Sequence, residues 1–67
     1  MNNEQKIEGL LYYFGEAIEK NKIKELLELT DEDFNLSLAN LNNNLLDRGI
    51  KLVEDSDTVG LYTAPQM

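Results

Sequence analysis

Two groups of neighbouring carboxylates are the first candidates for chemistry in this sequence. They are Asp31-Glu32-Asp33 and, further along, Asp55-Ser56-Asp57. The first group could bind a divalent cation, but consecutive acids at the start of a helix are typical of residues that cap it and complement its dipole. The second group resembles part of a calcium-binding loop, yet the glycine and the final glutamate of such a loop are missing, which favours a turn. The sequence therefore predicts no metal site.

Side chains that commonly carry catalysis are scarce in the composition. The chain contains no histidine, the residue that most often serves as a general base near neutral pH. It contains no cysteine, which excludes a disulfide and a Cys/His zinc site. Ser37, Ser56 and the threonines have no evident activating partner, and the four glycines are too scattered for a phosphate-binding loop. A small catalytic or metal-binding domain is the least favoured class, and we expect neither enzymatic activity nor a cofactor.

The length of 67 residues suits one domain, residues 1–67, which buries roughly 60% of the surface of its unfolded chain. Hydrophobic residues make up 42%, as in a globular domain. The longest apolar run, Leu10–Phe14, is far shorter than a membrane span. The residues Asn2, Asn3 and Glu4 do not form the basic start of a signal peptide. We therefore expect a cytoplasmic protein without a membrane partner.

Three amphipathic segments predict three helices. The first covers Asn3–Phe14, and Gly15 ends it. The second covers about Lys20–Leu29, with lysines and glutamates at partly i,i+4 spacing on a solvated face. Thr30 caps the third helix, which we expect to reach about Arg48. The residues expected to face a shared core are Ile7, Leu10, Leu11 and Phe14, then Ile23, Leu26 and Leu27, and finally Phe34, Leu38, Leu41 and Leu45.

The rest of the chain alternates between apolar and polar residues, which is typical of strands. Two strands, from Ile50 and from Val59, are joined by the polar turn Asp55-Ser56-Asp57-Thr58. Glu16-Ala17-Ile18 is a further short extended piece. Three helices followed by a β-hairpin predict an α+β fold, a winged helix-turn-helix, whose second and third helices form the helix-turn-helix. A bundle of helices alone fits less well, because the C-terminal residues alternate with period two.

A winged helix raises the question of DNA binding, with the third helix as the element that reads the groove. This helix has no Lys or Arg between Asp31 and Asp47, and the wing carries Glu54, Asp55 and Asp57. The whole chain has a net charge of −7. The asparagines of the third helix could contact base edges. Affinity for DNA, however, depends largely on Lys and Arg side chains that contact phosphates. The fold favours DNA binding, whereas the charge opposes it. Because function depends on the site and not on the fold, we expect no direct contact with nucleic acid.

Five apolar side chains fall outside the faces expected to be buried. They are Tyr12, Leu36, Leu46, Val53 and Tyr62. Single exposed apolar residues are ordinary, but five on so small a domain indicate a protein-interaction surface. A two-fold homodimer is the commonest way to cover such residues, and we expect its contact to include Tyr12 or Tyr62. The alternatives are that both tyrosines lean on the core with their hydroxyls in water, and that Leu46 is buried within the monomer.

Four short motifs follow one another through most of the chain. They are Ile7-Glu8-Gly9-Leu10-Leu11-Tyr12-Tyr13-Phe14-Gly15-Glu16-Ala17-Ile18, then Leu41-Asn42, then Arg48-Gly49-Ile50-Lys51-Leu52-Val53-Glu54, and finally Leu61-Tyr62-Thr63-Ala64-Pro65. In this order they resemble the segregation and condensation protein B (ScpB) family, over about residues 6–65.

The resemblance implies a non-catalytic winged-helix domain, the first of two in tandem, in an accessory subunit of a bacterial condensin. Its role would be chromosome segregation and condensation. The resemblance also implies a homodimer formed through this domain, a kleisin subunit as partner, and association with the nucleoid through that complex. The alternative function is a winged-helix DNA-binding transcriptional regulator.

Overall fold

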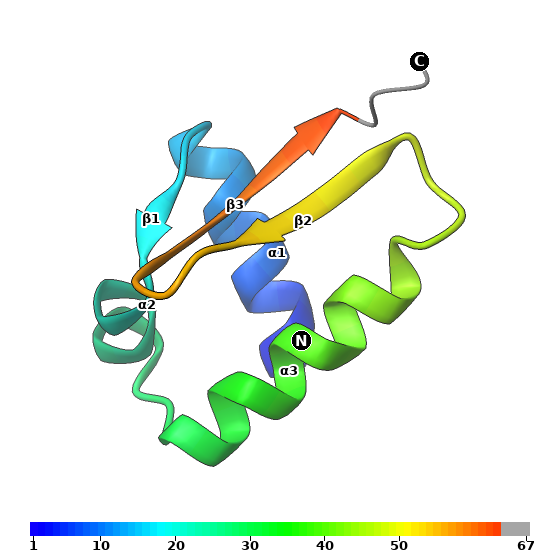
Figure 1. Ribbon diagram of the computed structural model, residues 1–67. Coiled ribbons are helices and arrows are strands. Elements are labelled where there is room, and N and C mark those ends of the chain that lie inside the picture. Colours follow the sequence, from blue (N-terminus) through cyan, green and yellow to red (C-terminus); the bar gives the residue numbers. More distant parts are fainter. Residues whose placement is uncertain (64–67) are drawn as a thin grey trace.

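Three helices and three short strands make up the chain in the computed structural model, which describes residues 1–63 (Figure 1). In order, the elements are α1 (Asn3–Phe14), β1 (Ile18–Glu19), α2 (Lys20–Leu27), α3 (Asp31–Asn44), β2 (Ile50–Glu54) and β3 (Thr58–Thr63). The order confirms the predicted α+β winged helix, with the β2–β3 hairpin as the wing. The Ala64-Pro65 pair that ends the last family-like motif lies outside the described residues.

The three strands form one antiparallel sheet with β3 in the middle, in the order β1-β3-β2. In the hairpin, Leu52 lies opposite Leu61 and Val53 lies opposite Gly60. On the other side of β3, Ile18 of β1 lies opposite Val59. The sequence predicted an extended piece before α2 but not its pairing, because two residues are too few to show an alternating pattern.

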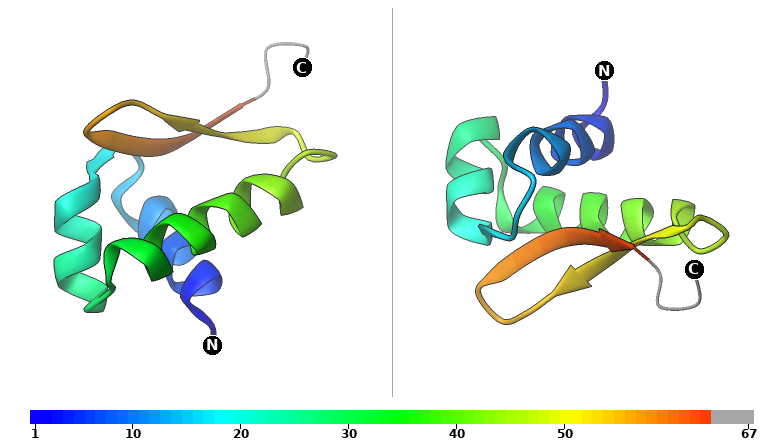
Figure 2. Two further views of the ribbon diagram at one scale, coloured as in Figure 1. Left: turned by 60° about the horizontal axis from the view of Figure 1, so that its bottom comes forward. Right: turned by 90° about the horizontal axis from the view of Figure 1, so that it is seen from above.

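The helices lie together on one side of the sheet, and α3 runs beneath the hairpin (Figure 2). α3 packs mainly against α1 and also contacts β2, while α1 reaches β3. The two layers share one core, whose buried apolar residues are Ile7, Leu11, Ile18, Ile23, Phe34, Leu38, Leu41, Leu45 and Val59. Leu10, Phe14, Leu27, Leu29, Leu52 and Leu61 are partly buried around it. The predicted stripe of the third helix is therefore confirmed.

α2 is shorter than the sequence predicted, because it ends at Leu27 and not at Leu29. Glu28 adopts a left-handed conformation with φ 54°, which turns the chain toward α3. The prediction that Leu26 is buried is also wrong, since 53% of this residue is exposed. α2 packs mainly against α1 and β1, and these neighbours cover Ile23 but leave the flank with Leu26 open to solvent.

α3 ends at Asn44, four residues before the predicted end at Arg48. The Leu45 N–H donates to the carbonyl oxygens of both Leu41 and Asn42, which tightens the last turn. The Arg48 N–H then donates to the Leu45 carbonyl, so the chain turns back toward β2 before it reaches Gly49. Although Leu45 lies beyond the helix, it is only 8% exposed and belongs to the core. The apolar stripe thus continues past the end of α3. For this reason the end of the helix was predicted too far along the chain.

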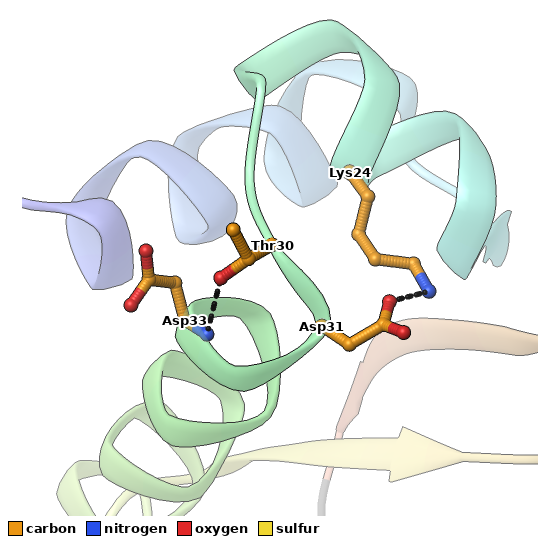
Figure 3. Close-up of polar contacts among 4 residues, drawn as sticks. All are labelled: Lys24, Thr30, Asp31 and Asp33. Atoms are coloured by element: carbon orange, nitrogen blue, oxygen red, sulfur yellow. Dashed lines mark hydrogen bonds and ion pairs between the residues drawn. The ribbon is translucent and has the colours of Figure 1, made fainter.

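Side-chain caps define the start of two helices. The Asp33 N–H donates to the Thr30 hydroxyl at 3.1 Å, which confirms the predicted cap of α3 (Figure 3). A complete capping box, which the sequence analysis missed, starts α1. There the Gln5 N–H donates to Asn2 Oδ1, and the Asn2 N–H donates to Gln5 Oε1. Each such cap contributes about 1 kcal/mol to helix stability.

Replacing Leu41 by alanine should destabilise the domain strongly, because this residue is 1% exposed. We expect a loss of about 2–5 kcal/mol, which includes the cost of the cavity left behind. Leu36→Ala on the same helix is the matched control. Leu36 is 63% exposed, so its truncation should change stability by less than about 0.5 kcal/mol. Urea unfolding, monitored by circular dichroism, measures the stability change of each variant. Equal effects would show that the stripe does not face the core.

Candidate protein-interaction surfaces

All five residues proposed as contacts are exposed, although they lie on different elements. Tyr12 is on α1, Leu36 is on α3, Leu46 follows α3, and Val53 and Tyr62 are in the hairpin. Leu46 is 68% exposed, so burial within the monomer does not explain it. It lies in a turn, although the third helix was expected to extend past it to about Arg48. Their role in binding a partner stays a prediction.

α1 presents the first exposed apolar surface. Tyr12 is 55% exposed and Tyr13 is 81% exposed. Next to them lies a shallow, largely apolar hollow lined by Met1, Gln5, Glu8 and Gly9. Apart from the neighbouring residues and backbone of the same helix, no atom lies within 4 Å of the position of a Cβ on Gly9, so a partner can approach the helix backbone closely there. Sequence reasoning did not single out Tyr13, although it too lies off the buried stripe.

The outer face of the hairpin presents the second surface. Across the two strands, Val53 lies opposite Gly60 and Lys51 lies opposite Tyr62. A Cβ on Gly60 would lie 3.1 Å from Tyr62 Cε2 and 3.1 Å from the Cα of Ala17. The Tyr62 ring therefore lies over the glycine, while 47% of the residue stays exposed. This geometry fits both hypotheses for Tyr62, since the ring covers the strand and still offers an apolar face.

α1 belongs to the helical layer, whereas the outer face of the hairpin points away from the helices (Figure 2). The structure therefore does not gather the five predicted residues into one patch. Tyr12 lies on a surface of α1, and Val53 and Tyr62 lie on a surface of the hairpin. Leu36 on α3 and Leu46 after it belong to neither surface. A single two-fold contact through one of these surfaces leaves the other available.

The part of the fold that would approach DNA is acidic. Asp31, Glu32 and Asp33 are exposed at the start of α3, and Asp55 and Asp57 are exposed at the tip of the hairpin. Both features lie at the same end of the domain (Figure 1). A negative potential at this end repels phosphates.

Two lysines of α2 neutralise part of this charge. Lys24 Nζ lies 2.8 Å from Asp31 Oδ1 (Figure 3), and Lys20 Nζ lies 2.6 Å from Glu54 Oε2. The sequence predicted instead that lysines of this helix face its own glutamates at i,i+4 spacing. The observed pairs join α2 to α3 and to the hairpin. Because their carboxylates are exposed, such pairs stabilise the fold by at most about 1 kcal/mol each.

A groove of about 350 Å³ lies between α3 and β2. Its lining residues are Asn35, Leu38, Ala39, Asn42, Leu52 and Glu54. In this fold class, the third helix and the wing are the elements that contact DNA. None of the six lining residues is basic, so the groove has no cationic side chain to pair with a phosphate.

Within residues 1–63, no group of three or more Asp and Glu side chains is arranged to hold a metal ion. Asp31-Glu32-Asp33 forms the first turn of α3, where the negative charges complement the helix dipole, and Asp55-Ser56-Asp57 forms the hairpin turn. No helix in this part of the chain is long and apolar enough to cross a membrane.

The described residues form a winged-helix domain with an acidic end and two exposed apolar surfaces. No protein-family model matches the chain, and no curated protein matches its sequence. Among solved structures, the domain is similar to a crystal structure of a dimer of the ScpB N-terminal domain complexed with an ScpA peptide. The TM-score is 0.84 at 24% sequence identity, over 94% of this chain and 82% of the other. This similarity confirms the winged-helix fold that the motifs implied.

The acidic charge of α3 and the wing predicts that the domain does not bind duplex DNA at physiological salt. Fluorescence anisotropy with a labelled duplex of mixed sequence should show no binding with a Kd below about 1 μM. A Kd below this value would be tighter than ordinary non-specific binding. Lowering the salt concentration should not produce the steep gain in affinity that phosphate contacts give. Tighter binding with a steep salt slope would favour a transcriptional regulator instead.

Proposed function

We propose that this chain is a non-catalytic protein-interaction domain of a bacterial condensin accessory subunit, which forms a homodimer and binds a kleisin subunit. The observation that carries the proposal is the fold similarity to the ScpB N-terminal domain, whose crystal structure is described as a dimer complexed with an ScpA peptide. Chromosome segregation and condensation, in the cytoplasm and at the nucleoid, is the role that follows.

The surface of the domain supports this proposal independently of the similarity. Two separate apolar surfaces, on α1 and on the hairpin, match the need for two contacts, one with a second copy and one with another protein. The acidic ends of α3 and the hairpin oppose the DNA contact that the fold otherwise allows. The residues that lie free to contact partners are mostly tyrosine, leucine and valine, which suits non-covalent association.

The proposed homodimer contact includes Tyr12 or Tyr62. Sedimentation equilibrium of the domain over a concentration series should show a reversible dimer, strengthened by salt because each copy carries a net charge of −7. A monomer up to about 100 μM, at both low and high salt, would contradict the dimer, since this limit excludes association stronger than roughly −5.5 kcal/mol.

Two charge substitutions locate the contact. Tyr12→Asp or Tyr62→Asp should weaken the dimer at least about tenfold, because a carboxylate would be desolvated in the interface. Asn40→Asp is the control, since it adds the same charge at an exposed position of α3 outside both surfaces. If all three variants dimerise like the parent chain, the contact excludes both tyrosines and this part of the proposal fails.

A further inference from the structure

The groove between α3 and β2 has one wall made by an edge strand. β2 pairs with β3 alone, because it is the last strand in the order β1-β3-β2. On its other side, every second residue of Ile50–Glu54 turns its backbone N–H and C=O away from the sheet. Such an edge accepts an additional strand from another chain. Residues Leu52 and Glu54 of this strand line the groove.

The opposite wall is a polar stripe on α3. Asn35, Ala39 and Asn42 follow i, i+4, i+7 spacing and therefore share one helix face. Each asparagine amide has both donors and an acceptor, which is the hydrogen-bonding complement of a peptide group. Two helical turns separate the amides by roughly 10 Å along the axis, the length of about three residues of extended chain. The small Ala39 between them leaves room for a backbone.

The floor and the ends of the groove define what can enter it. Leu38 and Leu52 form an apolar floor, where a small apolar side chain can be buried. Glu54 marks one end, where Asp31 and Asp55 are also exposed. Lys20 and Lys24 pair with two of these acids, and the end remains negative. This charge attracts a cation and repels a phosphate backbone.

We propose that this groove binds an extended peptide segment, which adds to β2 as a further strand. The segment has a small apolar side chain over Leu38 and Ala39, and a Lys or Arg at the end beside Glu54. The inference rests on the proposed function, because it assigns to the kleisin contact a place on this chain and a conformation. It places the kleisin between α3 and β2, away from Tyr12 on α1 and from the outer face of the hairpin with Tyr62, so either tyrosine stays available for the second copy.

The test uses synthetic peptides that tile the kleisin encoded in the same genome, each longer than the five residues of β2. The tightest-binding peptide is then made in two N-methylated forms, which carry methyl groups on alternate residues in the two possible registers. In an added strand, alternate N–H groups point toward β2 and away from it. The two forms should differ in affinity at least about tenfold, and the weaker one should be the form methylated on the N–H groups that face β2.

Ala39→Arg provides the complementary change in the protein. A long cationic side chain there should fill the groove and repel the basic end of the peptide, which lowers affinity at least about tenfold. Asn40→Arg is the matched control, because the next residue lies about 100° around the helix, outside the groove. Both positions are exposed, so both variants should unfold at the same urea concentration as the parent chain.

The possible outcomes separate this inference from the proposed function. If a kleisin peptide binds but both N-methylated forms or Ala39→Arg bind like the parent, the groove assignment is overturned while kleisin binding stands. If no kleisin peptide binds, kleisin binding and the groove assignment both fail. Loss of binding with one methylation register and with Ala39→Arg, but not with Asn40→Arg, is the result that the proposal expects.

Discussion

The apolar stripe of α3 is the contact on which both layers of this domain depend. Phe34, Leu38 and Leu41 are almost fully buried, and they meet α1 on one side and the hairpin on the other. So short a chain has little further core to compensate for a loss. The orientation of α3 is therefore fixed by burial, and this decides which of its residues face solvent. Leu36 becomes exposed, and Asn35, Ala39 and Asn42 come to face β2.

The charge on this frame opposes the DNA contact that a winged helix otherwise allows. The two elements that would enter and flank a DNA groove carry carboxylates, amides and small apolar residues. The proposed extended peptide would lie in the groove between a face of α3 and the edge strand β2. The domain shares its fold with the ScpB N-terminal domain, whose crystal structure is a dimer complexed with an ScpA peptide.

Local features of the sequence were sufficient for much of the fold. α1 was predicted with its bounds because the helical period stops at Gly15, whose φ of 71° suits glycine. The predictions were wrong where tertiary contacts determine where an element ends or which residues are buried. Leu45 keeps the apolar period beyond the end of α3, Leu26 faces solvent because no element covers it, and β1 depends on pairing with distant Val59. The exposure of Tyr12, Leu36, Val53 and Tyr62 followed from the helical and strand periods. The groove needs two distant elements and was not predicted.

The central claim is that this winged helix binds protein and not DNA. Native mass spectrometry of one mixture tests it directly, with the domain, the kleisin peptides and a short DNA duplex present together at near-physiological ionic strength. The account predicts ions of a domain dimer carrying peptide, and no ions that contain both domain and duplex. Ions of the domain bound to duplex, with the peptides left free, would contradict it.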